Sequence, residues 1–338
     1  MRVFVTGGLG FIGSHTCVEL LNAGYDVAVL DNLSNSDKSV VDRIEQIAGR
    51  KIIFFEGDVR ERTCIQVAFT KFSPDAVIHF AGLKAVGDSV QQPLRYYNWN
   101  VAASITLFQV MAETNVKTLV FSSSATVYGH PATTLINESS PIMPTSPYGH
   151  SKAMIEQILA DMVNADSTWR IARLRYFNPA GAHKSGLLGE CPKGTPSNLM
   201  PYIAQVAAGK LPELKIFGGD YNTPDGTGVR DYIHVMDLAD GHVAALTYLG
   251  QQAGLITVNF GTGCGYSVLE MVLAVERISG KKVPYRIVER RTGDAEECVA
   301  DVSKAMSLLG WNARYGLDEI CCDLLKWETN QFRQATVI

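Results

Sequence analysis

Short apolar runs rich in β-branched residues alternate with stretches of helical periodicity along the first half of the chain. The runs cover residues 2–6, 26–30, 52–56, 76–80, 118–122 and 169–175. Helical stretches lie between them, among them residues 93–113 and 148–164. This alternation predicts an α/β fold with a parallel, doubly wound sheet. Because ligands of such sheets bind at the carboxyl ends of the strands, the residues that follow each run are the first candidates for a site.

The second half of the chain has a different pattern. Between residues 177 and 198, Gly and Pro recur without a regular period. The pattern then predicts helices over 199–208, 267–279 and 318–332, strands over 214–217, 256–260 and 283–288, and a loop over 225–234 that enters a helix near Val235. We therefore expect a doubly wound domain of residues 1–176, with a return segment near 230–260, and a smaller mixed α/β lobe of residues 177–229 and 261–338.

The composition is that of a globular protein. The 338 residues are 46% apolar and 19% charged, and the net charge of -4 gives no reason to expect a nucleic acid or an anionic membrane as a partner. Seven scattered cysteines without a Cys-x-x-Cys pair indicate reduced thiols. No apolar run suits a signal peptide or a membrane span, and no histidines pair at a metal-ligand spacing. We therefore expect a cytoplasmic protein that binds no metal.

The turn after the first run carries glycines at positions 7, 8, 10 and 13, and a helical pattern follows it. Strand, glycine turn and helix in this order suit a dinucleotide, because glycines let the backbone approach a pyrophosphate at the positive end of the helix dipole. The second run ends at Asp31, eighteen residues after Gly13. A carboxylate at that distance accepts hydrogen bonds from the adenosine ribose and repels the additional phosphate of NADP. The pattern therefore predicts NAD as the cofactor.

A further helix is expected to begin near Tyr148, because a proline precedes an apolar pattern of helical spacing. Tyr148 and Lys152 lie four residues apart and therefore on one face of this helix. A phenol becomes a base near neutral pH if its pKa falls by about 3 units, roughly 4 kcal/mol, and one cation about 4 Å away supplies energy of that order. The same spacing is common on solvated helix faces, so the pair alone does not establish a site.

Five elements together resemble the extended short-chain dehydrogenase/reductase family: the glycine turn with Asp31, the Gly57-Asp58 step, the serines 122–124 that end the fifth run, the pair Tyr148 and Lys152, and segment 176–179. Within that family, the chain is similar to the UDP-hexose 4-epimerases over nearly its whole length. The strings that carry this likeness are residues 31–36, 79–87, 121–129, 198–203 and 225–240. The resemblance implies a Rossmann-like doubly wound sheet, bound NAD and a UDP-sugar substrate.

The resemblance also implies a set of site residues. Tyr148 would be the catalytic base, Lys152 would lower the pKa of Tyr148 and bind the nicotinamide ribose, and Ser124 would hydrogen-bond O4 of the sugar or relay its proton. NAD would be held by Gly7, Gly10, Phe11, Ile12, Gly13, Asp31, Asn32, Leu33, Ser34, Asn35, Ser36, Asp58, Val59, Phe80, Ala81, Gly82, Lys84, Asn100, Ser122, Tyr148, Lys152 and Phe177. The UDP-sugar would be held by Lys84, Ser124, Tyr148, Asn178, Asn198, Leu199, Phe217, Arg230, Arg291, Asp294 and Cys298.

In the implied reaction, Tyr148 takes the O4 proton while a hydride leaves C4 for NAD. The resulting 4-ketose presents its other face, and the hydride returns with inversion at C4. Because no net redox change occurs, NAD is expected to stay bound through the cycle. Arg230 and Arg291 would hold the diphosphate while the sugar turns, although either arginine alone would be better interpreted as part of a surface ion pair.

Cys298 bears on the choice of sugar. In the family that the chain resembles, a large tyrosine at the matching position restricts the pocket to plain hexoses, and a smaller residue leaves room for a 2-acetamido group. The hypothesis is that Cys298 opens the pocket to UDP-GlcNAc and UDP-GalNAc as well as to UDP-glucose and UDP-galactose. The alternative is that Cys298 is a buried thiol without such a role.

Two departures from the family pattern and two alternative functions qualify this interpretation. Ala103 and Ser104 stand where the family has Gly-Thr, which predicts a packing adjustment, and no role follows for Trp99.

A nucleotide-sugar dehydratase needs an Asp-Glu pair after the position of Ser124, where this chain has Ala125 and Thr126. A non-catalytic NAD-binding regulator commonly lacks the Tyr or the Lys. By analogy, the helices over 93–113 and 148–164 would form a four-helix homodimer interface.

Overall fold

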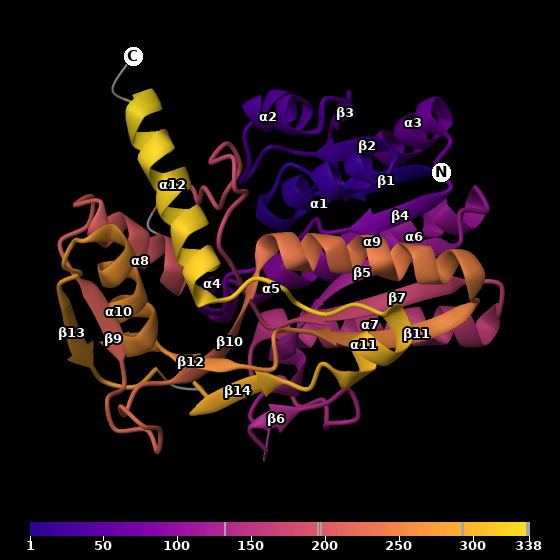
Figure 1. The fold of residues 1–338 in the computed structure, drawn as a ribbon. Coiled ribbons are helices and arrows are strands. Elements are labelled where there is room, and N and C mark those ends of the chain that lie inside the picture. Colours follow the sequence, from indigo (N-terminus) through magenta and orange to yellow (C-terminus); the bar gives the residue numbers. More distant parts are fainter. Residues whose placement is uncertain (132, 195, 197, 292–293, 336–338) are drawn as a thin grey trace.

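A computed structural model describes residues 1–338 except 132, 195, 197, 292–293 and 336–338 (Figure 1). Its centre is a seven-stranded sheet in the order β11-β7-β5-β4-β1-β2-β3, and every neighbouring pair of these strands is parallel. The strands are β1 (Arg2–Thr6), β2 (Asp26–Asp31), β3 (Ile53–Glu56), β4 (Ala76–His79), β5 (Thr118–Ser124), β7 (Arg170–Tyr176) and β11 (Gly254–Phe260). The predicted α/β fold with a doubly wound sheet is confirmed.

Helices cover both faces of this sheet because successive strand residues point to opposite sides. Val3 and Val5 of β1 pack in the apolar core beneath one helix layer, whereas Phe4 packs in the core on the other face. The first layer contains α1 (Phe11–Asn22), α2 (Ser39–Ala48), α9 (Val235–Gln251) and α11 (Ser303–Leu309), and the second contains α3 (Arg62–Phe72), α6 (Ala103–Glu113) and α7 (Pro147–Ala165). Both cores are formed by residues that alternate along the strands.

A smaller lobe lies beside the carboxyl ends of the strands (Figure 1). One of its sheets has the order β12-β10-β14-β6, with β8 paired to β10, and a two-stranded sheet joins β13 to β9. The strands are β6 (Leu135–Ile136), β8 (Asn178–Ala180), β9 (Leu214–Phe217), β10 (Val229–His234), β12 (Gly265–Ser267), β13 (Tyr285–Val288) and β14 (Glu297–Ala300). Helices α8 (Leu199–Ala207), α10 (Val268–Ser279) and α12 (Leu317–Ala335) enclose its separate apolar core. The predicted mixed α/β lobe is therefore present.

Two predicted elements differ from the structure. The segment expected as a loop over 225–234 contains strand β10, whose Asp231 is fully buried and accepts hydrogen bonds from the backbone N–H groups of Thr262, Gly263 and Ala300. Because polar residues such as Asp231 interrupt its apolar residues, the segment lacks the apolar run that predicts a strand. The helix expected over 93–113 is divided into α5 (Pro93–Tyr96), a π-helical segment η1 (Tyr97–Ala102) and α6. A short helix, α4 (Val86–Gln91), precedes them, and a 3-10 turn, η2 (Ala125–Tyr128), follows β5.

The replacement of Gly-Thr by Ala103 and Ser104 is accommodated at the junction of η1 and α6. The Ser104 hydroxyl donates to the carbonyl oxygen of Asn100 at 2.6 Å and contacts Nε2 of His79 at 2.9 Å. Both Ala103 and Ser104 are fully buried. Among the described residues, no helix is long and apolar enough to cross a membrane.

Candidate active site

The turn between β1 and α1 brings backbone N–H groups to the edge of the sheet. Gly7 has a φ of +68°, and a Cβ there would lie 2.7 Å from the backbone nitrogen of Ala81. A Cβ on Gly13 would lie 2.4 Å from the carbonyl oxygen of Gly7. Helix α1 follows Gly10, and no side chain of the described residues caps its first N–H groups. An uncapped helix end behind glycines fits the pyrophosphate of NAD, since the backbone can come close to it.

Asp31 ends β2 and fixes the loop that follows. One carboxylate oxygen accepts from the backbone N–H of Leu9 at 3.0 Å, and the other accepts from the N–H of Leu33 at 3.0 Å and from the Ser36 hydroxyl at 2.7 Å. These bonds join the glycine turn to the predicted cofactor residues 31–36. A carboxylate has about four acceptor positions, so Asp31 keeps capacity for a ribose hydroxyl.

Asp58 follows β3 and is held from two sides. Nε and Nη2 of Arg60 donate to its two oxygens at 3.0 and 2.7 Å, and Nδ2 of Asn32 donates at 2.8 Å. Partial burial raises the pKa of this carboxyl, but the hydrogen bonds from Arg60 and Asn32 outweigh it and lower the pKa to about 2. Asp58 is therefore a charged acceptor beside the loop of Asp31.

Asn100, predicted to contact NAD, supports the neighbouring loops from the buried side of η1. Its Oδ1 accepts from the backbone N–H of Leu83 at 2.8 Å, and its Nδ2 donates to the carbonyl oxygen of Leu83 and to the Ser151 hydroxyl, both at 3.0 Å. The Ser151 hydroxyl in turn donates to the carbonyl oxygen of Tyr148 at 2.7 Å. Asn100 thus joins the loop after β4 to the helix that carries Tyr148.

Helix α7 begins one residue earlier than expected, at Pro147. The Ser146 hydroxyl accepts from the N–H of Gly149 at 3.2 Å, and proline suits the first helical position because its missing N–H would be unpaired there. Tyr148 and Lys152 lie on the face that meets the end of β5. The Lys152 ammonium donates to the carbonyl oxygen of Ser122 at 2.6 Å and lies 5.9 Å from the centre of the Tyr148 ring.

The pKa shifts in this pair differ from the sequence-based expectation. Burial raises the pKa of Tyr148, and a hydrogen bond with Ser124 opposes that shift. Burial lowers the pKa of Lys152 to about 8, and the charge of Glu156 opposes it. The expected lowering of the Tyr148 pKa is therefore not found, because burial outweighs the opposing hydrogen bond and the Lys152 ammonium donates to the carbonyl oxygen of Ser122. The nicotinamide of bound NAD would bring the further positive charge that favours the phenolate.

Sequence reasoning missed a buried polar network behind this pair. Glu156 accepts from the Ser123 hydroxyl at 2.5 Å and from Nε and Nη2 of Arg175 at 2.9 and 2.6 Å. Nη1 of Arg175 also donates to the Tyr128 hydroxyl at 2.9 Å. The signal was available, because Glu156 follows Lys152 by four residues and therefore shares its helix face. The network fixes the backbone between Ser122 and Ser124.

Three of the predicted substrate residues meet in the sheet of the smaller lobe. Arg230 on β10 is paired in register with Cys298 on β14, and Asn178 on β8 is paired with Tyr232 of β10. Burial raises the pKa of the Cys298 thiol to about 11, and the charge of Arg230 opposes that shift. Cys298 is therefore a neutral, half-buried side chain next to an arginine.

Two other predicted residues stack at the outer side of this lobe. The Arg291 guanidinium lies 3.7 Å from the centre of the Phe217 ring, and the N–H of Asp294 donates to the carbonyl oxygen of Arg291 at 3.2 Å. A planar cation over an aromatic ring leaves its N–H edge available for phosphate oxygens.

A further acid, Glu190, lies between predicted cofactor and substrate residues. Its carboxylate is ion-paired with Lys84 and accepts from Nδ2 of Asn198 at 2.8 Å. The carbonyl oxygen of Glu190 accepts from the indole N–H of Trp327 at 3.1 Å. The sequence carried no signal for Glu190, because a single acid in a Gly-rich and Pro-rich segment is usually solvated.

The remaining predicted residues lie in the same strand-end loops. Val59, Phe80, Ala81 and Gly82 follow β3 and β4, Phe11 and Ile12 form the first turn of α1, and Leu199 opens α8. Phe177 follows β7 and packs with Val127 and Tyr128. The described residues contain no group of three or more His, Cys, Asp or Glu side chains that would hold a metal ion.

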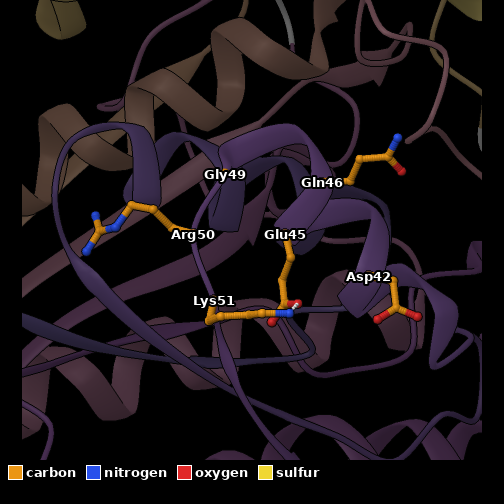
Figure 2. Close-up of a pocket in the computed structure, with 6 residues that line it drawn as sticks. All are labelled: Asp42, Glu45, Gln46, Gly49, Arg50 and Lys51. Carbon is orange, nitrogen blue, oxygen red and sulfur yellow. Dashed lines mark hydrogen bonds and ion pairs between the residues drawn. The ribbon is translucent and has the colours of Figure 1, made fainter.

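The structure also has a surface hollow of about 420 Å³, which Figure 2 shows in close-up. It is lined by Asp42, Glu45, Gln46, Gly49, Arg50 and Lys51, at the end of α2 that leads into the amino end of β3. Lys51 and Glu45 pair across it at 2.5 Å, as the dashed line shows. Because it lies at the amino end of β3, at the edge of the sheet opposite the strand-end loops, it adds nothing to the site.

Comparisons with known proteins identify the family of the chain. A family model described as GDP-mannose 4,6 dehydratase matches residues 4–324. UDP-glucose 4-epimerase of Bacillus subtilis (strain 168) is 55% identical over 330 residues, which cover 98% of this chain and 97% of the relative. The enzyme of that name from Homo sapiens is 52% identical over 334 residues, 97% of this chain and 96% of the relative.

Solved structures extend the likeness to the fold. A UDP-glucose 4-epimerase from Stenotrophomonas maltophila with bound NAD and formylated UDP-arabinopyranose has a TM-score of 0.97 and 51% identity, covering 99% of both chains. That from Bifidobacterium longum in complex with NAD+ and UDP has a TM-score of 0.95 and 52% identity, covering 98% of both chains. Given this likeness over the whole length, the chain belongs to the UDP-glucose 4-epimerase family, within the broader family that the matching model describes.

Proposed function

We propose that the protein interconverts UDP-glucose and UDP-galactose by NAD-dependent epimerisation at C4. One observation carries the proposal: Tyr148, Lys152 and Ser124 converge where β5 ends, in the same sheet edge as the uncapped glycine turn. Likeness to epimerases solved with NAD supports the same conclusion.

The side chains divide the work of the reaction. When bound, NAD supplies a reversible acceptor for the hydride of C4. Tyr148 takes the O4 proton and later returns it, with Ser124 as its hydrogen-bonding neighbour. Lys152 holds a positive charge near the phenol ring and stabilises the phenolate. The Glu156 and Arg175 pair keeps the serine backbone in position beneath them.

The smaller lobe binds the nucleotide end of the substrate. Arg230 and Arg291 supply permanently charged donors for the diphosphate, while Asn178, Asn198, Leu199, Phe217 and Asp294 hold the uridine side. Strong binding of the diphosphate with few contacts to the sugar leaves the 4-ketose free to turn. The side chain of Cys298 is small and neutral, which supports the extension of the substrate range to UDP-GlcNAc and UDP-GalNAc.

Assembly and cellular location belong to the same proposal. Val90 on α4, Leu94 on α5 and Met154 on α7 are 62%, 81% and 46% exposed, which supports a homodimer interface over these helices. Sedimentation equilibrium of the wild type and of a Leu94→Glu variant tests this interface. A cytoplasmic location is proposed from the sequence alone.

Incubation of the protein with UDP-galactose, without added NAD, tests the proposed activity. Formation of UDP-glucose by protein that contains NAD is the expected result. Loss of water from the sugar would indicate a dehydratase, which the structure does not favour because Ala125 and Thr126 stand after Ser124 and the backbone N–H and the hydroxyl of Thr126 both donate to the Ser124 oxygen. No turnover by NAD-loaded protein would indicate a regulator.

A further inference from the structure

The ring of Trp99 contacts the guanidinium of Arg60, which lies in a strand-end loop. The Arg60 guanidinium lies 3.9 Å from the centre of the Trp99 ring, and that of Arg95 lies 5.4 Å from it. Arg60 belongs to the loop after β3, whereas Trp99 belongs to η1. The contact therefore joins two segments that are 39 residues apart in the sequence.

Both partners are anchored. Arg60 is held by the paired hydrogen bonds to Asp58, which fix the plane of its guanidinium before it meets the ring. Trp99 precedes Asn100, which is 2% exposed and uses its side-chain amide on Leu83 and Ser151. Because neither side has to be ordered when the contact forms, little conformational entropy is lost.

The position of the contact gives it a consequence. In the sheet order β4-β1-β2-β3, the loop of Leu83 follows β4 and the loop of Arg60 follows β3. The ends of β1 and β2, with the glycine turn and Asp31, lie between them. Three strand spacings amount to about 14 Å, which the contact and its anchors span.

We propose that Arg60 and Trp99 form a clasp over the cofactor end of the site, which has to open before NAD leaves. The proposal rests on the proposed function. In that reaction NAD undergoes no net change, so the protein does not need to exchange it between cycles. Arg60 and Trp99 are positioning residues, because they act through Asp58 and Asn100 on the loops of the predicted cofactor residues.

The test is the rate of NAD release from the full-length, NAD-loaded protein, followed by trapping free NAD with alcohol dehydrogenase and ethanol. Trp99→Ala should release NAD about three- to tenfold faster than the wild type, as expected for the loss of a cation–π contact. Trp99→Tyr, which keeps an aromatic face, should restore most of the slow release. Arg62→Ala removes a nearby surface arginine that pairs with Glu113 instead, and its release should match the wild type.

A double-mutant cycle separates the clasp from a general loss of stability. In Trp99→Ala with Arg60→Ala, release should be no faster than in the more affected single variant, since each change already removes the contact between Arg60 and Trp99. Release of Trp99→Ala at the wild-type rate, or effects of the two changes that multiply, would overturn the proposal. If the wild type binds no NAD, the proposed function itself fails; if it binds NAD and epimerises while Trp99→Ala retains NAD normally, only the clasp fails.

Discussion

The Lys152 ammonium lies 5.9 Å from the centre of the Tyr148 ring, but its 2.6 Å hydrogen bond goes to the carbonyl oxygen of Ser122. Burial raises the pKa of Tyr148, and a hydrogen bond with Ser124 opposes that shift. This hydrogen bond connects α7 to the end of β5, and it leaves the positive charge of Lys152 close enough to the ring to stabilise a phenolate. In the proposed reaction, the positive nicotinamide of NAD would add to the charge of Lys152 and favour the phenolate.

Tyr148→Phe removes the phenolic oxygen that we propose as the acceptor of the O4 proton. We expect kcat for UDP-galactose to fall by about 10²- to 10⁴-fold, the usual contribution of a positioned acid–base group. NAD should remain bound, because the glycine turn and Asp31 are unchanged. Tyr25→Phe, far from the site, is the matched control, and comparable turnover by the two variants would contradict the role of Tyr148.

The buried lysine predicts a pH dependence of stability. Burial lowers the pKa of Lys152 to about 8 in the folded chain, compared with the ordinary value of about 10.5 expected in the unfolded chain. Between these values the unfolded state binds more protons, so the free energy of unfolding gained from this group rises with pH. The rise in the free energy of unfolding should be about 1–3 kcal/mol between these pH values in the wild type, and Lys152→Met should lack it. Urea denaturation at pH 7 and pH 10 measures it, and parallel pH profiles would contradict it.

Gly7→Ala tests the glycine turn. The φ of +68° and a Cβ 2.7 Å from the backbone nitrogen of Ala81 leave no room for a methyl group. The loops after β1 and β4 must separate, so we expect NAD affinity to fall by about 5- to 150-fold, since backbone strain of this kind costs on the order of 1–3 kcal/mol. Gly24→Ala is the control, because Gly24 has a φ of +86° but no atom within 4 Å of a Cβ. Calorimetric titration with NAD compares them, and equal affinities would exclude a special role for Gly7.

Glu156→Gln breaks the buried pair beneath the serines. Arg175 would be left as a buried charge without its anionic partner, so we expect a loss of about 3–5 kcal/mol in the free energy of unfolding. Replacing both partners, as in Glu156→Gln with Arg175→Met, should recover part of that loss. Chemical denaturation measures the wild type, Glu156→Gln, Arg175→Met and the double variant, and additive losses would show that the pair does not act as a unit.

Cys298→Tyr tests the substrate range. The larger side chain next to Arg230 should lower kcat/KM for UDP-GlcNAc by more than about tenfold, because a filled pocket rejects the acetamido group. Activity on UDP-glucose should change little, and Cys298→Ser should keep both activities. An unchanged ratio of the two kcat/KM values in Cys298→Tyr would contradict the hypothesis.

Local patterns predicted the main sheet well. Strands such as β1 and β4 are apolar runs that end in turns. The face of the sheet to which each side chain points follows from the two-residue period of a strand. The glycine turn and Tyr148 with Lys152 were visible for the same reason, because their geometry is set within a few residues. Strand β10 was missed, since buried Asp231 is satisfied by backbone groups from distant segments that no local pattern reveals.

By itself, the sequence determined the α/β alternation, the cofactor type and the face on which Tyr148 and Lys152 stand, since these depend on spacing within one or two elements. Only the tertiary structure decided where the Lys152 proton points, which carboxylate lies beneath the serines and what Trp99 contacts. Each of those depends on side chains brought together from different strands and helices. The role of Trp99 becomes visible only when the loop after β3 is folded against η1.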